Sequence, residues 1–172
     1  MFLDETGFSF RSRVGVTWGP TGQTPVFRRV SKRRELSTII GLTVSGSILK
    51  RPFKHTIHGP DVVIFLKHLR RRLRAPLIVI WDRLSAHRSR EVEDYLAEDP
   101  EVSVEWLPPY APELNPEEGC HGNVKQHLRN AAPRDEEEIR QQADREFARI
   151  GRHHKLVMSF FHHAGISVKS LT

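Results

Sequence analysis

Cysteine is almost absent from this chain, with Cys120 as its single occurrence in 172 residues. One cysteine rules out an internal disulfide and argues against a cysteine-rich zinc site, so we expect a reducing cytoplasm. Long apolar runs are also missing, since the longest covers residues 75–81 and contains Pro76. Such a run is far too short to cross a bilayer, and the acidic start of the chain is unlike a signal peptide. We therefore expect no membrane partner.

The composition also lacks repeats and low-complexity tracts, and its 38% apolar and 28% charged residues are ordinary for a globular protein. Positive charge is in excess, with a net charge of +6 and a pI near 9.9. Basic residues are clustered at positions 28–29, 32–34, 50–51 and 70–74. A surface of this kind attracts nucleic acid, because phosphate contacts dominate such binding, but a solvated surface without a partner explains the charge equally well.

The first half of the sequence predicts β-strands. Strand-forming residues occupy positions 2–3, 14–18, 36–44 and 47–56. After Gly59-Pro60 the apolar residues change to helical spacing over positions 62–73, with a basic outer surface and Asp61 suited to the helix start. Residues 77–81 are continuously apolar, which is typical of a parallel strand buried on both faces.

The second half alternates helices and strands before ending in helices. A helix is predicted at 88–97, a strand at 102–107 and a stiff proline-rich loop at 108–112. Asn115 and Pro116 begin a helix extending to about residue 130, and Asp135 with Glu138 begins another by a capping-box arrangement. A last short helix ends near residue 165. This order indicates a mixed α/β fold in one domain over residues 1–172.

Acidic residues mark the predicted site. Asp4 and Asp82 each follow a short apolar segment, and ligands of open α/β sheets bind beyond the carboxyl ends of strands. A turn or a helix cap explains either aspartate alone, and two together weaken that explanation without excluding it. Near residue 115, Glu118 could form a capping box with Asn115, and Glu117 could simply favour the helix dipole. Spacing alone does not decide between these roles.

Three segments resemble the signature blocks of the DDE transposases of bacterial insertion sequences related to mariner elements. They are FLDETGF (2–8), IWDRLSAH (80–87) and LPPYAPELNPEEG (107–119), of which the last is the most specific. With WGPTGQTP (18–25), the resemblance covers nearly the whole chain. It implies an RNase H-like fold, an α/β mixed sheet flanked by helices.

The resemblance also implies a catalytic triad of Asp4, Asp82 and Glu118. In the family, the acidic residue two positions after the last proline of the third block completes the set, which is Glu118 and not Glu117. The 35 residues from 83 to 117 keep the family's spacing. These carboxylates would hold two Mg²⁺ or Mn²⁺ ions, since hard oxygen ligands suit these ions and argue against zinc. The implied activity is DNA cleavage by water followed by transfer of the new 3′-OH to target DNA.

Further roles follow from the same resemblance. His87 would orient a phosphate or a metal-bound water, Glu5 would support the metal ligands, and Lys125 would contact DNA. Local packing explains His87 equally well, and a solvated surface explains Lys125 equally well. Arg83 stands where the family usually has asparagine, and His121 stands where it generally has tryptophan.

The expected partner is double-stranded DNA, both transposon ends and target. The predicted DNA-binding residues are Arg70, Arg71, Arg74 and Arg83. The family's helix-turn-helix region is absent before Asp4, so we expect a truncated first strand and a separate helix-turn-helix polypeptide. A homodimer on DNA and a location at the bacterial nucleoid, in the cytoplasm, also follow from the resemblance.

Two alternative functions fit the same residues. A catalytically inactive transposase remnant would bind DNA through its basic surface, and the short first strand and Arg83 favour it. An RNase H-like nuclease would cut DNA without strand transfer, but the third signature block argues against it. The complete carboxylate set favours the active transposase.

Overall fold

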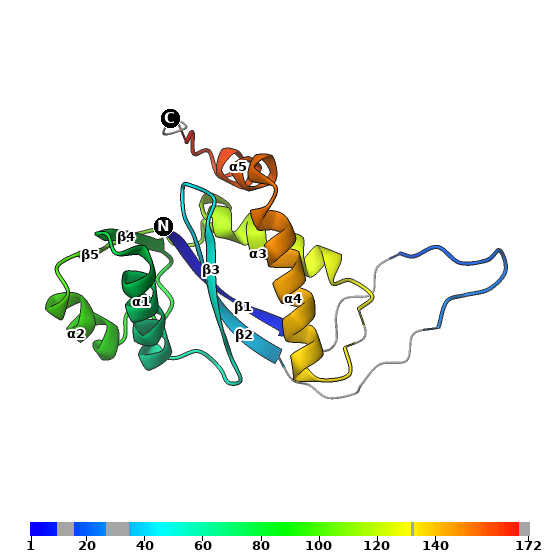
Figure 1. Ribbon diagram of the computed structural model, residues 1–172, viewed down its shortest axis with the longest axis horizontal. Coiled ribbons are helices and arrows are strands. Elements are labelled where there is room, and N and C mark those ends of the chain that lie inside the picture. The colour runs from blue at the N-terminus through cyan, green and yellow to red at the C-terminus, as the bar shows by residue number, and fades with distance from the viewer. Residues whose placement is uncertain (10–15, 27–34, 132, 169–172) are drawn as a thin grey trace.

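The computed structural model describes residues 1–9, 16–26, 35–131 and 133–168. Its centre is a five-stranded mixed sheet in the order β3-β2-β1-β4-β5 (Figure 1). The strands are β1 (Phe2–Ser9), β2 (Glu35–Leu42), β3 (Ile48–Phe53), β4 (Leu77–Trp81) and β5 (Val102–Trp106). Strands β1, β2 and β3 pair antiparallel, whereas β1, β4 and β5 pair parallel.

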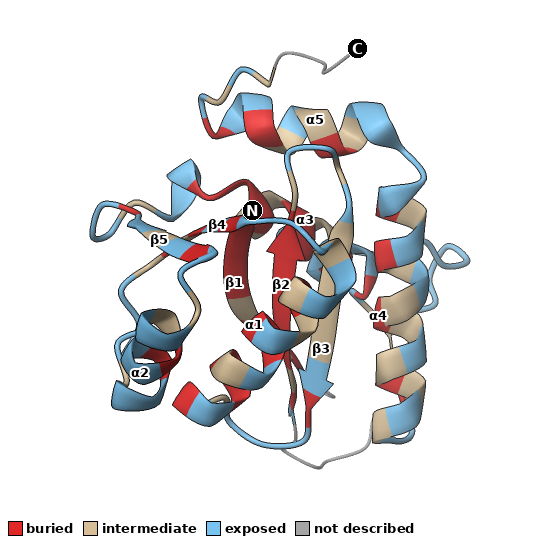
Figure 2. Cartoon of the chain, turned by 60° about the vertical axis from the view of Figure 1, so that its left-hand side comes forward, coloured by how far each residue is buried: buried red, intermediate tan, exposed pale blue. Residues whose placement is uncertain are grey.

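Helices cover the two faces of this sheet unequally. The helices are α1 (Gly59–Leu73), α2 (Arg90–Glu98), α3 (Pro116–His127), α4 (Glu136–Gly151) and α5 (His154–His163), with a 3₁₀ turn at Pro112–Leu114. Alternate side chains of a strand point to opposite faces, so Leu3 joins the apolar cluster under α1 and α2 while Phe2 joins the cluster under α3, α4 and α5. Figure 2 shows that β1 and β2, between these layers, are the most buried strands. Within the described ranges, no helix is long and apolar enough to cross a membrane.

Most elements predicted from the sequence are present. Strand β4 has the predicted bounds, and β2, β3 and β5 differ from prediction by at most three residues at an end. The strand predicted at 14–18 is wrong for residues 16–18, which form no regular element, and residues 14–15 lie outside the described ranges. The basic clusters at 28–29 and 32–34 also lie outside them.

Strand β1 corrects the prediction that Asp4 ends a short strand. The strand continues to Ser9 and pairs with β2 over its whole length. The sequence obscured this because acidic residues and glycine are depleted in strands, but pairing with the strongly apolar β2 outweighs that preference. Strand β1 therefore lies at the centre of the sheet, and Asp4 is one of its inner residues.

Strand β4 corrects a second prediction, that residues 77–81 are buried on both faces. Leu77, Val79 and Trp81 are buried against α1 and α2, but Ile78 on the other face is 57% exposed. The reason is that α3 and α4 pack against β1, β2 and β3. Only Ile80, nearer to β1, reaches the cluster under those helices.

Side chains cap two helices close to the predicted positions. Asp61 lies at the third position of α1 and accepts a hydrogen bond from the His58 backbone N–H at 3.0 Å, so it is inside the helix start and not the cap itself. Asp135 is the N-cap of α4, and its side chain accepts from the Glu138 N–H at 2.8 Å. Both carboxylates satisfy backbone groups that the helix leaves unpaired.

We predict that Asp135→Ala lowers the free energy of unfolding by about 1 kcal/mol, because the Glu138 N–H loses its acceptor. Urea denaturation followed by circular dichroism measures this effect. Asp135→Ser keeps an acceptor at the cap and serves as the control. Equal stability of the alanine and serine variants would contradict the assigned cap.

Candidate active site

The register of two parallel strands brings Asp4 and Asp82 together. Phe2 of β1 lies opposite Ile80 of β4, and the same offset two residues later places Asp4 beside Asp82. Phe2 packs under α3, α4 and α5, so Asp4 faces that side as well, and Asp82, which follows the last residue of β4, lines the same cleft as Asp4. Although Asp4 is inside its strand, it lies level with the carboxyl end of β4, where α/β sheets bind ligands.

Helix α3 brings further carboxylates to this edge. Its N-cap, Asn115, accepts from the Glu117 N–H at 3.1 Å and donates to the Leu3 carbonyl at 3.3 Å, which ties the helix start to β1. The Asn115 backbone N–H donates to Pro112 O, and the Glu118 carboxylate lies 2.9 Å from His121 Nε2. The capping box between Asn115 and Glu118 is therefore not formed, and Glu118 is available for another role.

The three acidic residues predicted from the sequence line one cleft. Asp4, Asp82 and Glu118 surround a hollow of about 380 Å³, together with Arg83 and the proline-rich loop at 107–112. The side chains of Asp82 and Glu118 are 45% and 42% exposed, while that of Asp4 is 11% exposed. Asp4 thus forms the floor of the cleft and the other two carboxylates form its open sides.

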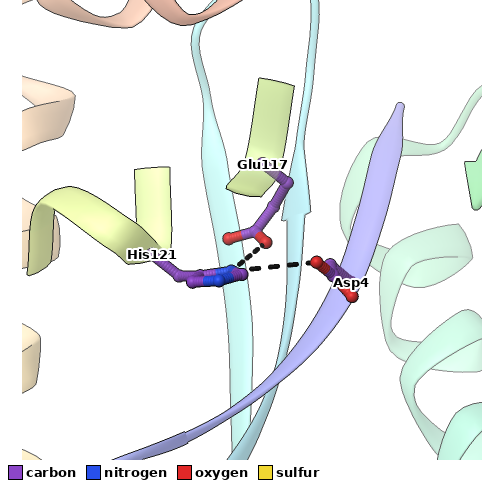
Figure 3. A group of neighbouring side chains, drawn as sticks. All are labelled: Asp4, Glu117 and His121. Atoms are coloured by element: carbon purple, nitrogen blue, oxygen red, sulfur yellow. Dashed lines mark hydrogen bonds and ion pairs between the residues drawn. The ribbon is translucent and has the colours of Figure 1, made fainter. Parts of the chain in front are cut away.

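A buried group that the sequence prediction missed contacts Glu118 through His121, and Figure 3 shows its members Asp4, Glu117 and His121. His121 Nδ1 is 2.7 Å from Glu117 Oε2 and 3.8 Å from Asp4 Oδ2. Ligand atoms of these three residues all lie within 4.8 Å of one another. Residues four apart on a helix are neighbours, so the spacing of Glu117 and His121 is the signal that could have found this pair.

The ionisable side chains of this group change one another's pKa. Burial, and next the charge of Glu117, raise the pKa of Asp4 to about 8. Burial also raises the pKa of Glu117 to about 7, against the effect of its hydrogen bond with His121. Burial alone would lower the pKa of His121, but hydrogen bonds with Glu117 and Glu118 outweigh it and raise the pKa to about 10. An imidazolium therefore compensates the crowded carboxylates, which together are suited to hold a cation.

A second histidine holds Asp82 from the opposite face of the sheet. His87 Nδ1 lies 2.9 Å from Asp82 Oδ1, and its Nε2 lies 2.6 Å from Glu5 Oε1. The ring is buried and stacks on Trp81 at a centroid distance of 4.3 Å. Both ring nitrogens of His87 are bonded to groups inside the protein. His87 therefore does not face a phosphate or a water in the cleft, and this differs from the role that the resemblance implied. It positions Asp82 instead, and Glu5 positions His87.

The arginines of α1 lie away from the cleft. Helix α1 leads into the first residue of β4, whereas the cleft lies beyond the last. Arg70 forms ion pairs with Asp99 and Glu101, which also precede a strand of the sheet. Arg71 and Arg74 are exposed at this same far end. The predicted DNA contacts of Arg70, Arg71 and Arg74 are therefore not contacts at the cleft.

Two exposed cations do lie near the carboxylates. Arg83 lines the cleft directly. Lys125 is exposed on α3, and its charge helps to lower the pKa of Glu118, after the hydrogen bond of Glu118 with His121. These two residues are placed to attract a phosphate group toward the cleft.

Comparisons with known proteins agree with this architecture. The family described as DDE superfamily endonuclease matches residues 1–140. Among curated proteins, none matches the chain. Many solved structures match, and three are representative.

The first of these structures is a Mos1 transposase paired-end complex with the left transposon end (20% identity, TM-score 0.69, 95% of this chain and 54% of that chain). The second is a mariner Mos1 paired-end complex with Mg (17% identity, TM-score 0.73, covering 95% of this chain and 52% of that chain). The third is the Mos1 transposase catalytic domain with raltegravir and Mn (17% identity, TM-score 0.67, covering 95% of this chain and 78% of that chain). This chain spans about half the length of the first two proteins. At these identities the likeness shows the fold, and it confirms the RNase H-like sheet expected from the sequence.

Proposed function

Since the match over residues 1–140 makes this chain a member of the DDE superfamily endonucleases, we propose that it is the catalytic domain of a mariner-like transposase. The reaction is metal-dependent cleavage of DNA at the ends of an insertion sequence, followed by strand transfer. The observation that carries this proposal is the convergence of Asp4, Asp82 and Glu118, from three separate elements, on one cleft.

The residues at the cleft fit a divalent metal site. They offer hard oxygen ligands, as Mg²⁺ and Mn²⁺ prefer. Burial, and next the charge of Glu117, raise the pKa of Asp4 to about 8, and a bound cation would offset both effects. When bound, such ions activate the attacking oxygen and neutralise charge on the leaving oxygen. We propose Asp4, Asp82 and Glu118 as the ligands and two as the number of ions.

The remaining side chains orient the ligands and the substrate. His87 fixes the Asp82 carboxylate through a bond of 2.9 Å and is itself fixed by Glu5. Arg83 at the cleft and Lys125 beside Glu118 would bind backbone phosphates of double-stranded DNA. In this proposal the protein contributes mainly positioning and charge compensation, which dominate catalysis of phosphoryl transfer.

The proposal extends to partners. The similar structures include complexes with transposon ends, and the net charge of +6 suits DNA binding. We propose that this domain acts as a homodimer on DNA, that a helix-turn-helix module recognises the transposon ends, and that the protein is found at the bacterial nucleoid.

We predict that the purified chain nicks supercoiled plasmid in the presence of Mg²⁺ or Mn²⁺ and not in the presence of EDTA. Asp94→Asn, on the exposed side of α2, should nick equally well and is the control. A labelled oligonucleotide that ends in a 3′-OH should become joined to the plasmid. Nicking without joining would identify a nuclease, and intact plasmid in every reaction would identify an inactive remnant.

A further inference from the structure

His121 and Glu117 occupy the centre of the buried group but are not among the metal ligands proposed above. His121 is 7% exposed, and its two nitrogens face carboxylates: Nδ1 faces Glu117 and Asp4, and Nε2 faces Glu118. A buried histidine surrounded by three acidic side chains, two of which line the cleft, is either their counterion or one of a set of ligands.

The Glu117 carboxylate indicates which of the two is correct. Its side chain is fully buried, and its Oε1 has no hydrogen-bond partner within the described part of the chain, although Oε2 contacts His121. An unpaired carboxylate oxygen in a protein interior is costly, and a counterion role for His121 leaves this atom unsatisfied. A bound cation would satisfy it.

The distances are also suited to one ion. Nitrogen and oxygen ligands bind first-row divalent metals at about 2.0–2.2 Å, so ligand atoms of one ion lie at most about 4.4 Å apart. Ligand atoms of Asp4, Glu117 and His121 lie within 4.8 Å of one another, so small side-chain movements would close the site. They come from one strand and from a single turn of α3, which the bond from Asn115 to Leu3 holds against that strand.

We infer that Asp4, Glu117 and His121 form a mixed oxygen–nitrogen metal site in which the imidazole of His121 is a direct ligand. This inference rests on the proposed metal-dependent function and adds two ligands to it. The chemical consequence is selectivity: imidazole suits transition metals, whereas Mg²⁺ favours oxygen. This site therefore prefers Mn²⁺ over Mg²⁺. The ion would also replace the imidazolium charge as the compensation for the carboxylates.

Pulsed electron paramagnetic resonance of the full chain, loaded with Mn²⁺ and labelled with ¹⁵N-histidine, tests this directly. We expect hyperfine coupling from one bound imidazole nitrogen in the unchanged protein and in His127→Gln, the exposed histidine at the end of the same helix. We expect the coupling to be lost in His121→Gln. Glu117→Gln, which keeps the size of that side chain, should weaken Mn²⁺ binding.

Competition titrations provide a second readout that does not depend on activity. The preference for Mn²⁺ over Mg²⁺ should fall by about tenfold or more in His121→Gln and stay unchanged in His127→Gln. Mn²⁺ bound without nitrogen coupling would overturn this inference and leave the proposed function intact. Failure of the chain to bind any divalent ion would overturn both.

Discussion

Asp4→Asn is expected to abolish metal-dependent DNA nicking and, at the same time, to stabilise the metal-free protein at neutral pH. The loss of activity follows because the variant lacks a metal ligand at the floor of the cleft. A catalytic metal contributes several kcal/mol of charge stabilisation, and each 1.36 kcal/mol is tenfold in rate, so we expect a loss of about 10³-fold or more. Plasmid nicking under saturating Mn²⁺ measures it.

The gain in stability follows from the raised pKa of the same residue. Burial and the neighbouring Glu117 raise the pKa of Asp4 from 3.8 to about 8, so between these values the folded chain binds a proton that the unfolded chain has released. Stability must therefore fall as the pH rises from about 4 to about 8. Asparagine carries no charge at any pH, so the variant should lose less stability over this range.

Urea denaturation at pH 5 and pH 8, in the presence of EDTA, compares the two proteins. Part of the pH dependence should persist in Asp4→Asn, because the pKa of Glu117 is also raised, to about 7. Asp94→Asn should behave as the unchanged protein in both assays. Full nicking by Asp4→Asn, or an identical loss of stability between pH 5 and pH 8, would show that Asp4 is not the buried ligand described here.

His87→Ala is expected to lower the free energy of unfolding by about 3–5 kcal/mol. The variant removes a ring stacked on Trp81 and leaves the Glu5 carboxylate, whose side chain is 12% exposed, without its partner. Removal of one partner from a buried ion pair is costly because the other charge stays in a poorly solvated place. Urea denaturation near pH 6 measures the difference.

The effect of His87→Ala should depend on pH. Burial alone would lower the pKa of His87, but hydrogen bonds with Asp82 and Glu5 outweigh it and raise the pKa from 6.5 to about 10. The stabilising charge is fully present below pH 6.5 and is lost as the pH rises through about 10. The difference between the two proteins should therefore be largest near pH 6 and smaller near pH 10.

A double variant separates the lost ion pair from the lost packing. Glu5→Gln removes the charge that His87→Ala leaves unpaired, so the two changes together should cost less than the sum of the single changes. Additive losses would mean that packing on Trp81, and not the ion pair, accounts for the effect. An unchanged pH dependence in His87→Ala would also argue against the protonated histidine.

The sequence predicted most of the fold where the residues follow a simple period. The apolar spacing at 62–73 predicted α1, and the continuous run at 77–81 predicted β4 with its correct bounds. The sequence did not predict the structure correctly where contacts between distant elements determine it. The polar residues of β1 after Asp4 become a strand because β2 pairs with them, and Ile78 is exposed because α3 and α4 lie over other strands.

The carboxylates were predicted by resemblance, and the structure brings them to one cleft, but their surroundings could not be predicted. The rotation of α3 about its axis decides whether Glu117 or Glu118 faces the cleft. A hydrogen bond between Asn115 and Leu3, which are 112 positions apart in the sequence, holds the start of α3 in this orientation. The arginines of α1 had the right charge for DNA, but only the topology shows that they lie at the far end of β4.

The offset between β1 and β4 restricts where this chain can change its length. The residues before and after Asp4 in β1 all pair with β2. One residue inserted or deleted before Asp4 would therefore turn its side chain to the opposite face of the sheet, toward α1 and α2, where Leu3 and Glu5 now point. Asp82 follows the last residue of β4, but its carboxylate is held by His87, five residues later, so the chain can change in length without disturbing that contact only beyond His87. Relatives that differ in length are therefore expected to carry their insertions after His87 and not within the first strand.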